Sequence, residues 1–273
     1  MPSAHATVLS KLPALTFLFW VMKIAATTLG ETAGDLMSMT LNVGYLVSTI
    51  ILMSAFVVVL VGQLAAKRYI PFLYWAVILA TSTAGTTMSD FMNRTLGLGY
   101  ATGSTILLST LIGVLVVWRL VEKSLSVSDV RSRRAEIFYW SAILVSNTLG
   151  TSLGDYLADD SGLGFAGGAL LIGGIIALIV AVYFLAKRMK VASAGLSVAL
   201  FWAAFVLTRP FGATMGDVLT KDADKGGLGF GTIGSSIVLA VVLIAVISYT
   251  MWRTPSARVI EPRKVVANAP DLS

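Results

Sequence analysis

Residues 20–35 read WVMKIAATTLGETAGD, and the same arrangement returns three more times along the chain. The other copies are WAVILATSTAGTTMSD at 75–90, WSAILVSNTLGTSLGD at 140–155 and WAAFVLTRPFGATMGD at 202–217. Each copy begins with tryptophan, has a glycine in its middle and ends with aspartate. Self-similarity at such long spacing indicates a protein built from tandem structural units.

Each copy is followed by a short loop and then by a second apolar stretch. This stretch opens with glycine and an aromatic residue, at Gly44, Gly99, Gly164 and Gly229. A unit therefore contains two helices, and two membrane crossings per unit give all four units the same orientation. We expect repeats at about 12–66, 67–121, 134–188 and 194–252, in one transmembrane domain spanning 1–273, with a cytoplasmic tail at 253–273.

The composition indicates an integral membrane protein. Of the 273 residues, 56% are hydrophobic and only 12% are charged, whereas soluble domains carry about 25% charged residues. A disordered chain, a secreted disulfide scaffold and a nucleic-acid-binding protein are excluded. The chain has no cysteine and one histidine, His5, so thiolate metal sites and a Ser-His-Asp triad are excluded too.

Eight apolar stretches are long enough to cross a bilayer, which takes about 20 residues. They run approximately over 12–36, 43–64, 71–92, 98–120, 137–157, 163–185, 196–219 and 228–252. We therefore expect an all-α integral membrane protein with eight transmembrane helices, arranged as four hairpin repeats of parallel orientation. Pro210 should kink the seventh helix.

The basic residues predict the orientation. Of the 20 Lys and Arg residues, fifteen lie on the side of the two termini and three on the other, while Lys23 and Arg209 lie inside apolar stretches. By the positive-inside rule, both termini are cytoplasmic. Topology thus explains the net charge of +6, and no nucleic-acid partner is needed; the expected partner is the lipid bilayer.

These features resemble a known family. Four tandem units, each with two transmembrane segments and a prominent tryptophan (Trp20, Trp75, Trp140 and Trp202), are similar to a bacterial membrane-protein family defined by a repeat of unknown function. The resemblance covers roughly residues 12–252. It implies this topology and a location in the bacterial inner membrane, and it implies no activity.

A polar stripe runs along the first helix of every repeat. Lys23, Thr27, Glu31 and Asp35 are spaced four apart and therefore share one helix face. The corresponding polar residues elsewhere are Ser82, Thr86, Asp90, Asn147, Thr151, Asp155, Arg209 and Asp217. Because lipid disfavours ionisable side chains, we expect the stripes to converge on a protein interior or a water-filled cavity. The aspartates should lie near its outer end.

The charges on these stripes favour a cation as ligand. Five acids face only Lys23 and Arg209, which leaves an excess of three negative charges to be neutralised by protons or bound cations. Hard divalent ions prefer such oxygen ligands. The predicted substrate- or ion-binding residues are Glu31, Asp35, Asp90, Asp155, Asp217, Thr27, Lys23, Arg209 and Asn147, with Glu31, Asp35 and Asp90 as the metal ligands.

The stripes also have structural interpretations. Each aspartate could organise the turn that ends its helix, and Lys23, Glu31 and Arg209 could form a buried ion-pair network that sets helix register. The four tryptophans could form an aromatic belt or pack between helices.

The leading hypothesis is a secondary transporter or exporter of a small cation, specifically a divalent metal ion as substrate. The alternatives are a transporter of an organic or zwitterionic solute and a non-transporting membrane scaffold or sensor. No nucleophile–base pair or nucleotide motif is recognisable, so we expect neither an enzyme nor a cofactor.

Overall fold

The structure is a computed structural model, and it describes residues 12–13, 15–191, 193–223 and 226–253. The described chain is helical and contains no strand. Its α-helices are α1 (Phe17–Asp35), α2 (Tyr45–Ala65), α3 (Pro71–Asp90), α4 (Tyr100–Glu122), α5 (Arg133–Asp155), α6 (Gly164–Arg188), α7 (Ala194–Thr220) and α8 (Gly231–Arg253). They match the eight predicted stretches to within a few residues at most ends. The predicted tail lies outside the described residues, apart from Arg253.

The helices begin and end where local chemistry allows. Thr16, Ser132 and Ser193 cap the N-termini of α1, α5 and α7 by accepting a backbone N–H with the side-chain oxygen, and Pro71 opens α3. After the aspartate that ends α1, α3 and α5, the chain continues into a five-residue π-helical turn. The fourth repeat differs, because Lys221 leaves α7 in an extended conformation.

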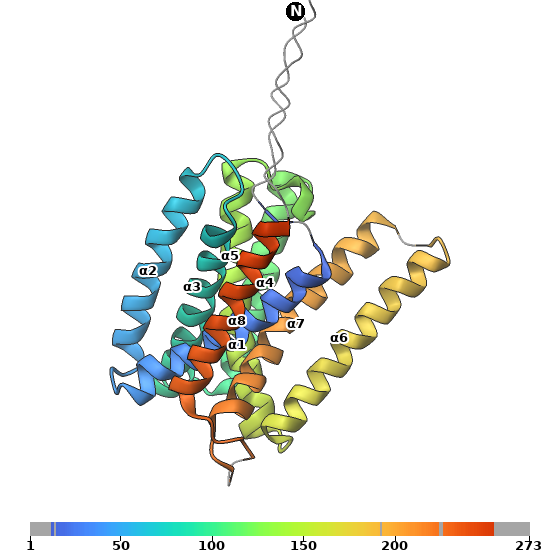
Figure 1. Cartoon of the computed structure of the whole chain (residues 1–273). Coiled ribbons are helices and arrows are strands. Elements are labelled where there is room, and N and C mark those ends of the chain that lie inside the picture. The colour runs from blue at the N-terminus through green and yellow to red at the C-terminus, as the bar shows by residue number, and fades with distance from the viewer. Residues whose placement is uncertain (1–11, 14, 192, 224–225, 254–273) are drawn as a thin grey trace, which may run out of the picture.

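The odd-numbered helices form a closed ring in the order α1, α3, α5, α7, and the even-numbered helices pack outside it. Each even helix covers the odd helix of the next repeat: α2 packs on α3, α4 on α5 and α6 on α7. The pattern closes when α8 packs on α1. In Figure 1, α2 and α6 accordingly lie at opposite edges of the bundle. The polar stripes therefore meet inside the ring.

The glycine in the middle of each repeat lets neighbouring ring helices approach closely. A Cβ atom at Gly150 would collide with the Arg209 side chain of α7, and one at Gly212 would collide with Thr27 of α1. The equivalent contacts of the other two repeats are Gly30 with Ser82 and Gly85 with Asn147. One sequence feature thus sets all four contacts between adjacent ring helices.

The repeat tryptophans pack between ring helices at the end opposite the aspartates. Trp75 lies on Phe19 of α1, with ring centroids 5.7 Å apart, and Trp140 lies on Tyr74 of α3 at 5.4 Å. Trp202 contacts Tyr139 in the same way. Of the two interpretations of the tryptophans, the structure favours packing between helices. We call this end of the bundle the tryptophan end and the other the aspartate end.

Five helices (α2, α4, α6, α7 and α8) are long and apolar enough to cross a membrane by length and composition. Large apolar side chains lie exposed on the outer helices, for example Val58 at 71% and Leu170 at 78% of their surface. Helices α1, α3 and α5 carry the polar stripes and lie mostly buried. The chain is therefore a multi-pass membrane protein whose polar helices are enclosed by apolar ones. Helix α7 continues through Pro210.

Candidate functional site

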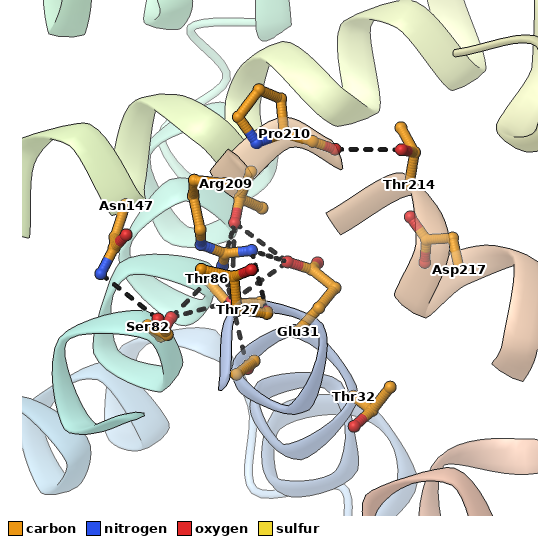
Figure 2. Close-up of polar contacts among 12 residues, drawn as sticks. Thr27, Glu31, Thr32, Ser82, Thr86, Asn147, Arg209, Pro210, Thr214 and Asp217 are labelled. Atoms are coloured by element: carbon orange, nitrogen blue, oxygen red, sulfur yellow. Dashed lines mark hydrogen bonds and ion pairs between the residues drawn. The ribbon is translucent and has the colours of Figure 1, made fainter. Parts of the chain in front are cut away.

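An ion pair lies at the centre of the ring. Arg209 of α7 donates from Nη1 to the Oε2 atom of Glu31 on α1 at 3.0 Å. The Arg209 side chain is fully buried, and that of Glu31 is 4% exposed. Figure 2 shows both side chains pointing toward one another from facing helices. These two residues occur in only one repeat each, so this contact breaks the fourfold pattern.

The other two ring helices complete this contact. Thr86 of α3 and Thr151 of α5 donate to the same Glu31 oxygen, at 3.2 and 3.1 Å. Both hydroxyls also accept from Nη2 of Arg209, as Figure 2 shows for Thr86. The pair is therefore hydrogen-bonded by side chains from all four ring helices. These hydrogen bonds help to offset the cost of burying the two charges, although Nε of Arg209 has no hydrogen-bond partner in the described chain.

The predicted polar residues one turn closer to the tryptophan end also converge. Asn147 of α5 donates to Ser82 of α3 at 3.3 Å, and Thr27 donates to the backbone oxygen of Thr208 at 3.2 Å. Arg209 reaches the Ser82 carbonyl at 3.3 Å. The expectation that these positions face a common interior is confirmed.

Lys23 lies another turn toward the tryptophan end and is isolated. Its side chain is fully buried, and its Nζ atom has no hydrogen-bond partner within the described chain. The ammonium lies 4.3 Å from the centroid of the Phe205 ring, a cation–π contact. The other ring positions at this level are the buried apolar residues Ile78 and Ile143. Lys23 therefore does not pair with Glu31.

The aspartates of α1 and α7 share a basic partner. Nζ of Lys221 lies 2.9 Å from Asp35 and 3.2 Å from Asp217. Burial disfavours the charged ammonium, but the carboxylates of Asp217 and Asp35 outweigh this effect and raise the pKa of Lys221 above its ordinary range. The ammonium thus acts as a built-in cation between two carboxylates.

The aspartates of α3 and α5 are joined in a similar way by Arg94. Its Nε atom lies 3.0 Å from Asp90, and its Nη2 atom lies 3.9 Å from Asp155. The guanidinium also lies near the rings of Tyr100 and Tyr45, at 5.6 and 6.0 Å from their centroids. The four aspartates therefore form two bridged pairs, one at the α1–α7 contact and one at the α3–α5 contact.

Three carboxylates come close enough to share one ion. An oxygen each from Glu31, Asp35 and Asp217 lie within 4.8 Å of one another, and all three residues are buried. The predicted metal ligands Glu31 and Asp35 belong to this group together with Asp217, whereas Asp90, the third predicted ligand, is not part of it. Asp90 lies 3.0 Å from Arg94 instead, although α3 packs on α1 as α7 does.

Sequence reasoning also missed the two bases that neutralise the aspartates. Arg94 and Lys221 lie beyond the predicted helices and were assigned to the loops, so the expected excess of three negative charges was too large. A signal was present, because each base follows its aspartate by four residues. This spacing places oppositely charged side chains side by side on a helix.

The four repeats match a known sequence family. The family described as Repeat of Unknown Function (DUF347) matches four segments of the chain, at residues 18–69, 73–124, 138–189 and 200–255. The chain belongs to this family. Each DUF347 match covers most of one odd helix and the whole of the even helix that follows it. Comparison with curated proteins finds no match, and comparison with solved structures finds none.

Proposed function

We propose that this DUF347 protein is a secondary transporter or exporter of a small divalent metal ion. The proposal includes eight membrane crossings, cytoplasmic termini and a place in the bacterial inner membrane. The single observation that carries it is the group formed by Glu31, Asp35 and Asp217, in which a loop lysine occupies the place of a cation.

The spacing of these carboxylates suits a hard ion. Mg²⁺ binds oxygen at about 2.0–2.1 Å, and Ca²⁺ binds it at about 2.3–2.6 Å. Two oxygens on opposite sides of one ion are therefore separated by about 4–5 Å. The carboxylate oxygens here lie within 4.8 Å of one another, so small side-chain movements suffice to coordinate one ion.

Lys221 gives the site a means of exchange. Its side chain is 24% exposed, whereas those of Asp35 and Asp217 are 4% exposed. Because Lys221 follows the end of α7, its ammonium can leave toward the aspartate end when a metal ion arrives. The lysine would then neutralise the carboxylates when the site is empty, and the metal ion would neutralise them when the site is loaded. The negative charges are never left uncompensated.

Arg209 would stabilise the empty site from the other side. It neutralises Glu31 through Nη1 while its Nη2 atom is bound by Thr86 and Thr151. A metal ion that takes over Glu31 leaves Arg209 with these hydroxyl contacts. Proton coupling would arise where a carboxylate takes up a proton in place of the metal.

The test is Mn²⁺ flux into proteoliposomes containing the purified protein. Glu31→Gln and Asp35→Asn should each abolish most of the flux, because each removes a charged ligand. Asp160→Asn is the matched control, since it removes an exposed carboxylate from the same end of the bundle. Unchanged flux in both Glu31→Gln and Asp35→Asn would overturn the proposal.

A second candidate is a non-transporting membrane scaffold or sensor. The observation that favours it is that each acid of the stripes has a basic partner within 4.0 Å. This candidate expects purified protein to bind no metal ion. For a scaffold or sensor, the double variant Glu31→Arg, Arg209→Glu should preserve cellular activity, because the ion pair is kept. For a transporter, the same double variant should lose activity, because a metal ligand is lost from position 31.

A further inference from the structure

A groove lies at the tryptophan end, away from the carboxylate group. It has a volume of about 830 Å³ and runs between the last turns of α4 and the first turns of α7. The segment that follows α4 forms one wall. Its chemically informative lining residues are Leu115, Arg119, Lys123, Asp129, Val198 and Trp202.

The groove wall is held in place by hydrogen bonds. The indole Nε1 of Trp202 donates to the backbone oxygen of Leu125 at 3.0 Å. Ser124 donates to the carboxylate of Asp129 at 2.6 Å and accepts the backbone N–H of Ser126 at 3.1 Å. Trp202 also packs edge-on against Trp118 of α4. The groove is therefore formed before anything binds in it.

The charge of the groove favours an anion. Arg119 lies in the last turn of α4 and Lys123 directly follows the helix; both are exposed and have no ion-pair partner in the described part of the chain. The acid in the lining, Asp129, already accepts hydrogen bonds from Ser124 and Ser128. Two basic side chains without an ion-pair partner and one hydrogen-bonded carboxylate give the edge of the groove a net positive charge.

The apolar surface that continues from the groove points to the rest of the ligand. Leu108, Ile112 and Leu115 follow one another at helical spacing on the face that leads to Arg119. Leu108 and Ile112 are 48% and 53% exposed. Helix α4 is apolar enough to cross a membrane, so this face lies against hydrocarbon and the basic residues lie at its polar boundary.

We infer that this groove is a binding site for an anionic phospholipid. The phosphate would contact Arg119 and Lys123, and an acyl chain would follow Leu115, Ile112 and Leu108. Charge complementarity selects the anionic headgroup. The continuous apolar face selects a lipid over free phosphate, since a small hydrophilic anion gains nothing from it. This inference does not depend on the proposed transport function.

The experiment measures binding of phosphatidylglycerol to the detergent-purified full chain by native mass spectrometry, with phosphatidylcholine as the neutral comparison. Phosphatidylglycerol should bind more tightly. The double variant Arg119→Gln, Lys123→Gln should weaken its binding about tenfold or more, because each basic residue contributes to headgroup affinity. Phosphatidylcholine binding should not change.

The matched control is the double variant Lys187→Gln, Arg188→Gln. It removes the same charge from exposed positions in the last turn of α6, at the same end of the bundle and outside the groove. Retained phosphatidylglycerol binding in this variant supports a defined site. An equal loss in both double variants, or equal binding of the two lipids, would overturn the proposal. So would displacement of the lipid by glycerol phosphate at equal concentration.

Both double variants should unfold at the same temperature as the parent protein when no lipid is added, because the four side chains are exposed. This separates a binding effect from a folding effect. Added phosphatidylglycerol should then raise the unfolding temperature of the parent and of the α6 variant, and should raise that of the α4 variant less, because a ligand that binds the folded state stabilises it.

Discussion

The aspartate pairs on opposite sides of the ring look alike but are neutralised differently. At the α3–α5 contact, Asp90 and Asp155 share Arg94, which lies near the rings of Tyr45 and Tyr100. At the α1–α7 contact, the pair shares a lysine instead, and Glu31 adds a third carboxylate. Repetition thus supplied four equivalent acids, and a few unrepeated residues made one pair different.

The difference assigns distinct roles to the two sides. Arg94 contacts two carboxylates and lies near two aromatic rings, so it is fixed at several points, although its side chain is 37% exposed. A lysine is a compact point charge on a flexible stem, and the two carboxylates that Lys221 contacts have a third, Glu31, close by. Within the proposed transport function, we assign ion exchange to the α1–α7 side and structural support to the α3–α5 side. The predictions below test this division, from the largest expected effect to the smallest.

The strongest effect should come from breaking the central pair. Arg209→Gln leaves Glu31 buried beside two hydroxyls without a positive charge, and it should destabilise the protein by about 3–5 kcal/mol. Thermal unfolding in detergent measures this. The double variant Arg209→Gln, Glu31→Gln should recover much of the loss, since no charge remains uncompensated. Additive losses in the double variant would show that the two side chains act independently.

The two aspartate pairs should differ in transport. Asp217→Asn removes a member of the carboxylate group and should reduce Mn²⁺ flux in proteoliposomes at least about tenfold, the scale of losing a partner at a metal site. Asp155→Asn changes the α3–α5 pair by the same chemistry and should leave the flux nearly unchanged. Equal losses would mean that both sides bind the ion.

The two bases should also differ in their effect on ion affinity. Lys221→Met removes the ammonium that competes for Asp35 and Asp217, so Mn²⁺ should bind roughly tenfold or more tightly. Isothermal titration calorimetry on purified protein measures the affinity. Arg94→Met is the control, because Arg94 lies on the other side of the ring. Weaker binding in Lys221→Met would contradict a competing role for this lysine.

The smallest effect concerns pH. The pKa of Lys221 lies above its ordinary range in the folded protein because of Asp217 and Asp35, even though burial opposes the charge. The ion pairs of Lys221 therefore contribute fully to stability below about pH 10, the pKa of this lysine in the unfolded protein. The contribution is lost as the pH rises toward the higher pKa that Lys221 has in the folded protein. The unfolding temperature of the parent protein should approach that of Lys221→Met above pH 10.

Arg94 provides the comparison for this titration, because a guanidinium stays protonated over the whole accessible range. The difference in unfolding temperature between the parent and Arg94→Met should stay constant from pH 7 to 11. If the difference in unfolding temperature between the parent and Lys221→Met also stayed constant from pH 7 to 11, deprotonation of Lys221 would not be linked to stability.

Much of the architecture could be predicted from residue order alone. The repeated tryptophan, glycine and aspartate defined the four units, and the spacing of Lys23, Thr27, Glu31 and Asp35 placed them on one helix face. These are local properties, because the helical period is the same in any α-helix. The convergence of the polar stripes inside the bundle could be predicted because charged side chains facing lipid cost free energy.

The partners of the charged side chains could not be predicted in this way. Asp35 pairs with Lys221, which is 186 positions away, and Glu31 meets Arg209 across 178 positions. Residue order does not say which carboxylates of neighbouring helices approach most closely, and the group that the structure brings together contains Asp217 and not the predicted Asp90.

The sequence by itself determined that this is a helical membrane protein of four like units, each with a buried polar stripe. Only the tertiary structure decided that α7 packs on α1 and closes the ring, while α8 covers α1 from outside, so that the first repeat lies beside the fourth. The physical reason is the distance along the chain over which each property acts. Helical period and hydrophobicity are set by residues close together in the sequence, whereas an ion pair between helices depends on which segments pack together. That closure distinguishes one aspartate pair, which has Glu31 beside it and Lys221 as its partner, from the pair that shares Arg94.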